Sequence, residues 1–361
     1  MDDKISIILP IFNVGPYLRN GIDSLINQTI GNENLEIIMV NDCSTDGSDK
    51  IIDEYADKYD CCIAIHHETN SGGAYTPRNT GIEASTGEYI MFLDPDDSYS
   101  LDTCEKLYDA LKKYDADVAF GRYRRVYSYE NKFEKSYSPY IDNIDEKYPN
   151  EYFENNKSNK FNLLYETFVN RVIYGVKLNS KYSLKKPIDI VYSEKIEDEH
   201  NLLKMPPAVW CKLYKRELIM ENNIRFQPFI SGDDMAFSLE ALLNANGIVL
   251  LNNLLAYNYF IRDLPDDKSI TKNVNFKLLD ELLDAYMYCA SCMSSFSNCV
   301  KVASLDSHIF HWFDLWKSSK FNKSENQLLL KKLKELKRIH NANFKTNLIY
   351  NYVIFVVRYF G

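Results

Sequence analysis

The stretch Glu88–Asp97 reads E-Y-I-M-F-L-D-P-D-D and decides the fold of the chain. Tyr89–Leu93 is a short apolar run, which is typical of a buried strand. The run stops at three acids: Asp94, Asp96 and Asp97. In an open α/β sheet ligands bind at the carboxyl ends of the strands, and oxygen ligands there suit Mg²⁺ or Mn²⁺. The alternative is a solvated acidic turn that caps the next helix.

The sequence around this stretch alternates between apolar runs and helical patterns. Further strands are predicted at Ile5–Leu9, Glu36–Val40, Cys62–His66 and Asp117–Phe120, and helices at Tyr17–Gln28, Asp49–Tyr59, Thr76–Ser85 and Leu101–Lys113. This alternation indicates an α/β fold, with a mostly parallel sheet covered by helices on both faces. Polar residues follow each of four strands, namely Asn13, Asp42, Asn70 and Asp94. We therefore expect four loops to form one cleft.

The pattern weakens after the first third of the chain. Residues 122–203 are rich in Tyr, Asn, Lys and Glu and read as a substrate-shaping insertion, with a helix at Phe161–Val172. Later helices are predicted at Val209–Asn222 and Met235–Asn244, short strands at Ile248–Leu251 and Leu255–Tyr259, and a helical region from Phe276 onward. Ser231 at a helix cap, followed by Asp233 and Asp234 in the first turn, is also what any helix N-terminus prefers.

Composition narrows the classes of function. The 361 residues, 45% hydrophobic and 26% charged, are ordinary for a globular protein, and a net charge of -9 argues against non-specific binding of nucleic acid. The first residues do not resemble a signal peptide, and no apolar run reaches the ~20 residues of a membrane span. We therefore expect a cytoplasmic protein with reduced cysteines. Gln327–Ile339 and Leu348–Val357 predict helices that form an oligomer, dock peripherally on the inner membrane face, or pack on the protein's own core.

Four motifs in order resemble those of a known family. They are I-S-I-I-L-P-I-F-N, I-I-M-V-N-D-C-S-T-D-G-S, N-S-G-G-A-Y-T-P-R-N-T-G-I and G-E-Y-I-M-F-L-D-P-D-D. With them, Ile5–Val126 resembles the nucleotide-sugar-binding half of family 2 glycosyltransferases, which have the Rossmann-like GT-A fold. V-W-C-K-L-Y-K-R-E-L and S-G-D-D-M-A-F extend the resemblance, which is greatest to bacterial enzymes that decorate cell-wall, teichoic-acid or capsular polymers. It implies a donor half at 1–126 and an acceptor half at 127–275. The C-terminal helical region at 276–361 is predicted from the sequence pattern alone and lies outside the resemblance.

The resemblance implies roles in binding a UDP-sugar donor. Asp42 would accept the N3–H of uracil, and Pro10 and Phe12 would shape the base pocket. Asn70 and Arg78 would approach the nucleotide, with Arg78 as a cation near the uracil or the diphosphate.

The same resemblance assigns the metal and the catalytic base. Asp96 would ligate a divalent ion, Mn²⁺ or Mg²⁺, while Asp94 would meet the ribose or a metal-bound water, and Asp97 is a further candidate. Asp234 would act as the general base that takes the proton of the acceptor hydroxyl. The family pattern is usually Glu-Asp, and here it is Asp233-Asp234, so the second acid is retained.

Two further residues are candidates in the acceptor half. Trp210 would form either a hydrophobic floor beside the acceptor or part of the core. Arg262, with Ser269-Ile270-Thr271, resembles a late family loop that closes over the diphosphate. His308, His311, Trp312 and Trp316 fall at helical spacing and are interpreted as packing.

These residues together predict an inverting, metal-dependent glycosyltransferase. It would transfer a hexosyl or N-acetylhexosaminyl group from a UDP-sugar to a hydroxyl of a glycan, polymer or lipid-linked acceptor. One alternative is a nucleotidyltransferase, which usually has a Gly-rich basic loop where this chain has P-I-F-N. The other is a carbohydrate- or nucleotide-binding protein with an inactive cleft, against which the intact acids argue.

Overall fold

The fold was examined in a computed structural model of the chain. The structure describes residues 3–127, 132–133, 190–192, 208–261, 274–293, 308–309, 311–340 and 344–360. The helix predicted at Phe161–Val172 and the candidate Arg262 lie outside the described residues.

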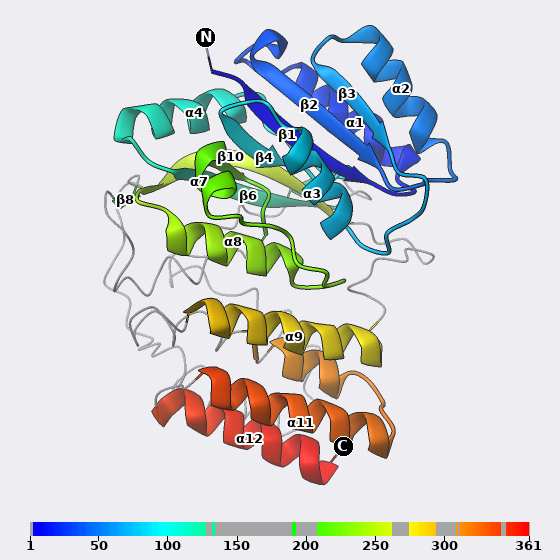
Figure 1. The fold of residues 1–361 in the computed structure, drawn as a ribbon, viewed down its shortest axis with the longest axis vertical. Coiled ribbons are helices and arrows are strands. Elements are labelled where there is room, and N and C mark those ends of the chain that lie inside the picture. The colour runs from blue at the N-terminus through cyan, green and yellow to red at the C-terminus, as the bar shows by residue number, and fades with distance from the viewer. Residues whose placement is uncertain are drawn as a thin grey trace.

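One twisted sheet organises the described residues up to Ile261 (Figure 1). Its strand order is β3-β2-β1-β4-β9-β6-β10-β5, with β7 beside β6 and β8 beside β10. The strands are β1 (Ile5–Ile11), β2 (Leu35–Asn41), β3 (Cys62–His66), β4 (Tyr89–Phe92), β5 (Ser98–Tyr99), β6 (Val118–Tyr127), β7 (Lys132–Phe133), β8 (Ile190–Tyr192), β9 (Lys212–Lys215) and β10 (Ile248–Ile261). Neighbours among β1 to β4 pair in parallel, as do β6 and β10, so the predicted mostly parallel α/β sheet is confirmed.

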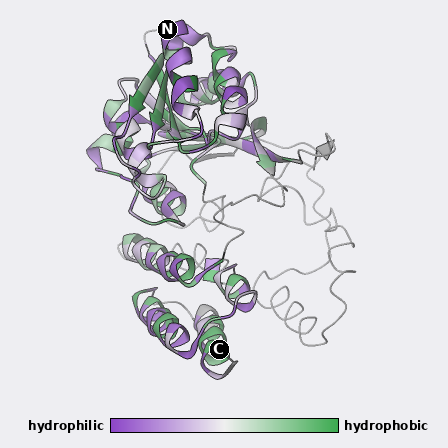
Figure 2. Ribbon diagram, turned by 90° about the vertical axis from the view of Figure 1, so that its right-hand side faces the viewer, coloured by the Kyte–Doolittle hydropathy of each residue, from purple (hydrophilic) through white to green (hydrophobic). Residues whose placement is uncertain are grey.

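Helices cover both faces of the sheet because its strands are apolar on both sides. On one face, α1 (Gly15–Ile26), α2 (Ser48–Lys58) and α4 (Thr103–Tyr114) pack on side chains such as Ile7 of β1. On the other face, α3 (Tyr75–Ala84), α7 (Arg216–Glu221) and α8 (Asp233–Asn244) pack on side chains such as Ile8. Figure 2 shows the strands as a hydrophobic layer between these helices.

The C-terminal helices form a second layered body below α8 (Figure 1). They are α9 (Phe276–Cys292), α11 (Lys323–His340) and α12 (Phe344–Phe360). A separate core joins the outer side of α8 to these helices and buries Trp312 and Trp316, so those two residues pack as predicted. No helix in the described part of the chain has the length and apolarity that a membrane crossing needs.

Two predictions of strands and helices were wrong. Val209–Asn222 is not one helix, because Lys212–Lys215 forms β9, antiparallel to both β4 and β6. Leu213 points into the core on one face of the sheet and Tyr214 into the core on the other, which is the two-residue repeat of a strand. The two short strands predicted after residue 247 are one long strand, β10, with register shifts between Leu250 and Tyr257.

Candidate active site

The carboxyl ends of β1, β2, β3 and β4 meet at one edge of the sheet, as their parallel pairing requires. The residues that follow these strands lie in contact across that edge. Asn13 Oδ1, after β1, accepts a hydrogen bond from the backbone of Thr45, after β2, at 2.8 Å. Asn70 Nδ2, after β3, donates to Asp42 Oδ2 at 3.0 Å. The loops after these three strands therefore do come together.

Asp42 is a buried carboxylate whose oxygens accept several hydrogen bonds. It is only 2% exposed and accepts from His67 Nδ1 at 2.8 Å, from Asn70, and from the backbone and hydroxyl of Ser71 at 3.0 and 2.8 Å. A nucleotide base that donates a hydrogen bond to Asp42 must therefore share a carboxylate oxygen with Ser71 or replace the hydrogen bond from Ser71. His67 was not predicted from the sequence, although it directly follows the last residue of β3.

The two residues expected at the base pocket differ in exposure. Pro10 lies buried within β1, where it pairs with Val40 of β2. Phe12 follows the end of β1 and is 47% exposed. Phe12 therefore has a ring face available to a ligand, while Pro10 acts through the shape of the strand.

Arg78 joins two parts of the cleft that are distant in sequence. Its Nη1 donates to Asp233 Oδ2 at 2.7 Å and to Asp234 Oδ1 at 2.5 Å, and its Nη2 donates to Asp94 Oδ1 at 2.8 Å. The side chain is 6% exposed, and its guanidinium lies 5.1 Å from the ring centroid of Phe226. Three carboxylates thus share one buried guanidinium.

The three acids after β4 are not equivalent. Asp94 and Asp96 are partly exposed, whereas Asp97 is 1% exposed. Asp97 accepts hydrogen bonds from the Tyr257 hydroxyl at 2.8 Å and from the Phe260 backbone at 2.7 Å. Burial raises the pKa of Asp97 well above that of an ordinary aspartate, and the charges of Asp96 and Asp94 add to the rise. Asp97 therefore joins the loop after β4 to β10 by hydrogen bonds and is not available to a ligand.

Asp233 and Asp234 occupy the first turn of α8, after Gly232 at the N-cap position with φ 91°; the expected Ser231 cap is therefore wrong. Burial raises the pKa of Asp234 to about 7; Arg78 opposes the rise, and Asp233 and Asp94 add to it. Its side chain remains 24% exposed, against 10% for Asp233. Asp234 is therefore the acid of this pair that a ligand can reach, and near neutral pH it can both lose and accept a proton.

A second buried cation stands near the pair. Lys212 of β9 is fully buried, and its Nζ donates to the carbonyl oxygen of Ala208. Burial lowers the pKa of Lys212, while the charges of Cys211 and Asp234 oppose this change. Lys212 was not predicted as a site residue, because the sequence pattern around it predicted a helix instead of β9.

Trp210 belongs to an aromatic cluster with Tyr257, Tyr259 and Tyr123. Its ring stacks on Tyr257 with 4.4 Å between centroids and meets Tyr123 edge-on at 4.8 Å. Trp210 is 8% exposed, while Tyr123 and Tyr259 are partly exposed. The geometry favours a core position for Trp210, with the two tyrosines at the margin of the cluster.

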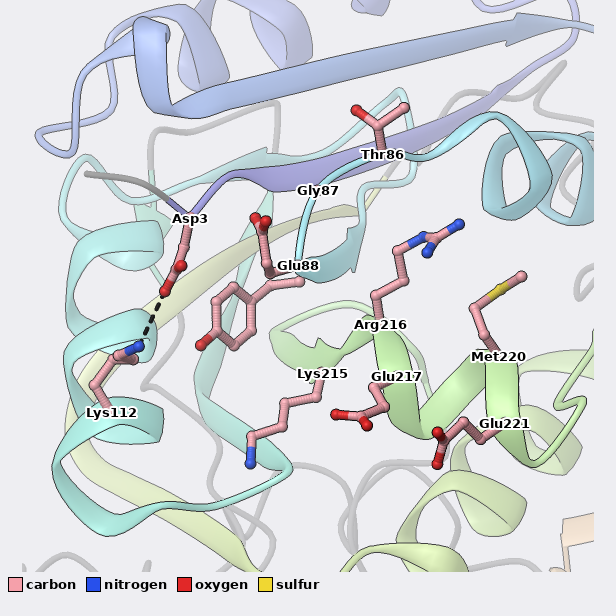
Figure 3. A pocket seen from close by; sticks show the side chains of 11 residues that line it. Asp3, Thr86, Gly87, Glu88, Lys112, Lys215, Arg216, Glu217, Met220 and Glu221 are labelled. Carbon is pink, nitrogen blue, oxygen red and sulfur yellow. Dashed lines mark hydrogen bonds and ion pairs between the residues drawn. The ribbon is translucent and has the colours of Figure 1, made fainter.

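A pocket of about 570 Å³ lies at the opposite, amino-terminal end of β4 (Figure 3). Charged side chains that line it include Asp3, Lys112 and Lys215. Lys112 pairs with Asp3 at 3.0 Å and Lys215 with Asp117 at 3.0 Å. Because the pocket lies at the end of β4 away from Asp94, it is not part of the candidate active site.

The carboxylates after β4 suit a metal ion that is also bound by the phosphates of the substrate. Within the described residues, no three His, Cys, Asp or Glu side chains gather as a preformed metal site. Two partly exposed carboxylates, Asp94 and Asp96, do lie at the strand end. Mg²⁺ is usually bound by one or two carboxylates together with substrate phosphates and waters. The residues therefore suit an ion shared with a bound diphosphate.

Known proteins with similar sequences are bacterial glycosyltransferases. The chain is 31% identical over 262 residues to glycosyltransferase GlyA of Streptococcus pneumoniae, in an alignment that covers 73% of this chain and 31% of GlyA. It is 38% identical over 123 residues to a poly(ribitol-phosphate) beta-glucosyltransferase of Bacillus spizizenii, covering 34% of this chain and 19% of that protein. The chain thus matches about a third or less of the length of these relatives.

The fold is that of a solved enzyme. A structure of Staphylococcus aureus TarS in complex with UDP-GlcNAc superposes with a TM-score of 0.56 at 20% identity, covering 98% of this chain and 91% of that one. Residues 6–175 match the family model described as Glycosyl transferase family 2. Through this match and its similarity to GlyA, the chain belongs to glycosyl transferase family 2, and the likeness to TarS shows that its fold is GT-A.

Proposed function

We propose that this protein transfers a sugar from a UDP-sugar to an acceptor hydroxyl, with inversion at the anomeric carbon and with a divalent metal. The observation that carries the proposal is the meeting of Asp94, at the end of β4, with Asp234, at the start of α8, on one guanidinium. This contact supports the proposal, because it brings the acid after β4 and the acid of α8 close together.

Asp42, Asn70, Phe12 and Pro10 would hold the nucleotide. The Asp42 carboxylate would accept the N3–H of uracil in exchange for a hydrogen bond from Ser71. Gly72, with φ 82°, gives the loop after Ser71 a conformation that suits glycine. Cytosine has no N3–H to donate, so a carboxylate at this position favours UDP over CDP.

Asp96, with Asp94 beside it, would hold the metal against the diphosphate. When bound, Mn²⁺ or Mg²⁺ neutralises charge on the departing diphosphate. Arg78 and Lys212 would supply fixed positive charge on the protein's side of the cleft.

Asp234 would act as the base in one direct displacement. As the acceptor oxygen bonds to the anomeric carbon, the bond from that carbon to the diphosphate breaks and the hydroxyl proton passes to Asp234. A carboxylate whose pKa is about 7 suits this task, since general bases work best when their pKa lies near the operating pH.

The names of the relatives support two further parts of the proposal, namely a polymer as the acceptor and glucose or N-acetylglucosamine as the type of donor sugar. TarS has been solved with UDP-GlcNAc, and the Bacillus relative is named for adding glucose to poly(ribitol phosphate). We infer that the donor is a UDP-hexose or a UDP-N-acetylhexosamine. The acceptor hydroxyl would belong to a cell-surface polymer, or to a glycan or lipid-linked precursor of one.

The experiment is transfer of radiolabelled sugar from several UDP-sugars to poly(ribitol phosphate) and to an uncharged glycan. The proposal predicts that one donor labels at least one of these acceptors and that the label appears as a β-linkage from an α-linked donor. Retention of the α-configuration would contradict the base role of Asp234. Absence of labelling and of UDP release with every donor would contradict the function itself.

We propose that residues 1–126 bind the donor, 127–275 bind the acceptor, and 276–361 complete the fold. Leu329, Leu333 and Leu336 of α11 are buried in the second core, so the amphipathic pattern serves the protein's own packing. On α12, Leu348 and Phe355 remain 44% and 53% exposed. We propose this face for any contact with a second copy or a membrane, and L348S/F355S would then lower the mass in solution or the binding to anionic vesicles.

A further inference from the structure

We propose that Arg78 is a positioning residue for the base rather than a ligand of the nucleotide. Its guanidinium holds Asp234 in place and ties it to Asp94, so that the donor side and the acceptor side of the cleft are set by one side chain. This inference rests on the proposed transfer reaction.

The contacts leave little of the guanidinium for direct contact with a nucleotide. Nη1 serves both Asp233 and Asp234, Nη2 serves Asp94, and the side chain is 6% exposed. Arginine stays protonated and presents its donors in a fixed plane, so it can hold acids from two elements at defined angles. A lysine at the same place would offer one compact charge.

The orientation of Arg78 is itself fixed by aromatic packing. The guanidinium lies over the ring of Phe226, which stacks on Phe237 of α8 with 4.2 Å between centroids and an interplanar angle of 9°. Phe92, at the end of β4, meets both rings edge-on at 5.1 and 5.3 Å. The strand that leads to Asp94 and the helix that carries Asp234 therefore share one aromatic cluster beneath Arg78.

The next residue of α3 fixes the segment that leads into α8. Asn79 Nδ2 donates to the carbonyl oxygen of Phe226 at 2.9 Å, and the backbone N–H of Phe226 donates to Asn79 Oδ1 at 2.9 Å. Two adjacent residues of α3 thus hold both the approach to α8 and its first acids. The contacts of Arg78 with the acids and of Asn79 with Phe226 together fix the position of Asp234 relative to α3.

A consequence follows for catalysis. A donor or ion that engages Asp94 alters the contact between Asp94 and Nη2, and the same guanidinium, through Nη1, transmits the change to Asp234. Loss of Arg78 would leave three carboxylates together and Asp234 misplaced. Turnover would then fall, while the nucleotide contacts made by Asp42 and Phe12 would remain.

The test compares R78Q and R78K with R19Q, which removes a surface arginine paired with Glu54. UDP affinity is measured by calorimetry, and KM and kcat by transfer from the active UDP-sugar. We expect R78Q to lower kcat at least 100-fold while UDP Kd changes less than threefold. R78K should recover less than a tenth of the wild-type kcat, and R19Q should match wild type. A rise in UDP Kd and KM of tenfold or more, with kcat within threefold of wild type, would overturn the proposal.

F226L keeps every charge and provides the test if R78Q does not fold. It should lower kcat about tenfold at unchanged UDP Kd, and an unchanged kcat would contradict the positioning role. A wild-type protein that neither binds UDP nor consumes any UDP-sugar would instead refute the proposed function. The two failures are therefore distinguishable.

Discussion

Replacing Asp234 by asparagine separates catalysis from helix capping. The change removes the proton acceptor but keeps the shape of the side chain, and the amide oxygen can still accept from Arg78 Nη1, which now lies 2.5 Å from Asp234 Oδ1. General-base catalysis contributes roughly 10²–10⁴-fold, which corresponds to about 2.7–5.5 kcal/mol of activation free energy. We expect D234N to lower kcat by that range.

Asp233 provides the matched control. It lies in the same helical turn and binds the same Nη1 at 2.7 Å, but its side chain is 10% exposed against 24% for Asp234. If both acids served only the helix N-terminus and the charge of Arg78, D233N and D234N would have similar effects. We expect D233N to lower kcat less than tenfold, because the accessible base remains.

The assay is steady-state release of UDP with saturating donor and acceptor, with UDP affinity and melting temperature measured for each variant. The UDP affinity and the melting temperature of D234N should be close to those of the wild-type protein. A D234N enzyme with kcat within threefold of wild type, or equal losses in D233N and D234N, would refute the assignment of the base.

Three other outcomes are expected. Because Asp234 must be ionised to accept a proton and its pKa is raised to about 7, kcat/KM should fall as the pH drops below about 7; a profile flat down to pH 5 would contradict this. D42N should weaken UDP binding and narrow the preference for UDP over CDP, as calorimetry can measure; an unchanged preference would remove Asp42 from the base pocket. D97N should lower the free energy of unfolding by about 1–3 kcal/mol, since it disturbs hydrogen bonds to Tyr257 and Phe260, and should leave UDP Kd unchanged. A D97N variant with normal stability and weak UDP binding would place Asp97 in the cleft instead.

The first half of the fold could be predicted because its signals are local. Runs such as Ile5–Leu9 and Glu36–Val40 are apolar on both faces, and only a central strand of a parallel sheet needs that. The parallel pairing then places Asp42, Asn70 and Asp94 at one edge without further information. The same reasoning fails for Lys212–Lys215, where four residues are too few for a two-residue period to stand out from a helical pattern.

The partners within the site could not be predicted from the sequence. Arg78 binds Asp233 and Asp234, which are 155 and 156 residues away, and only the packing of α3 against α8 brings them together. Asp97 follows Asp96 directly, yet it turns inward to Tyr257 of β10, because a buried hydroxyl and a backbone N–H need an acceptor there. Neighbouring acids with the same sequence signal thus have different roles.

We propose that this site binds a UDP-sugar together with a metal and breaks the bond between the sugar and the diphosphate. The most direct measurement is release of UDP from a panel of UDP-sugars, with Mn²⁺ or Mg²⁺ and again with a chelator, alongside calorimetry of UDP itself. We expect one donor to release UDP in the presence of the metal, and we expect the chelator to stop that release. No UDP binding and no release from any donor would contradict it.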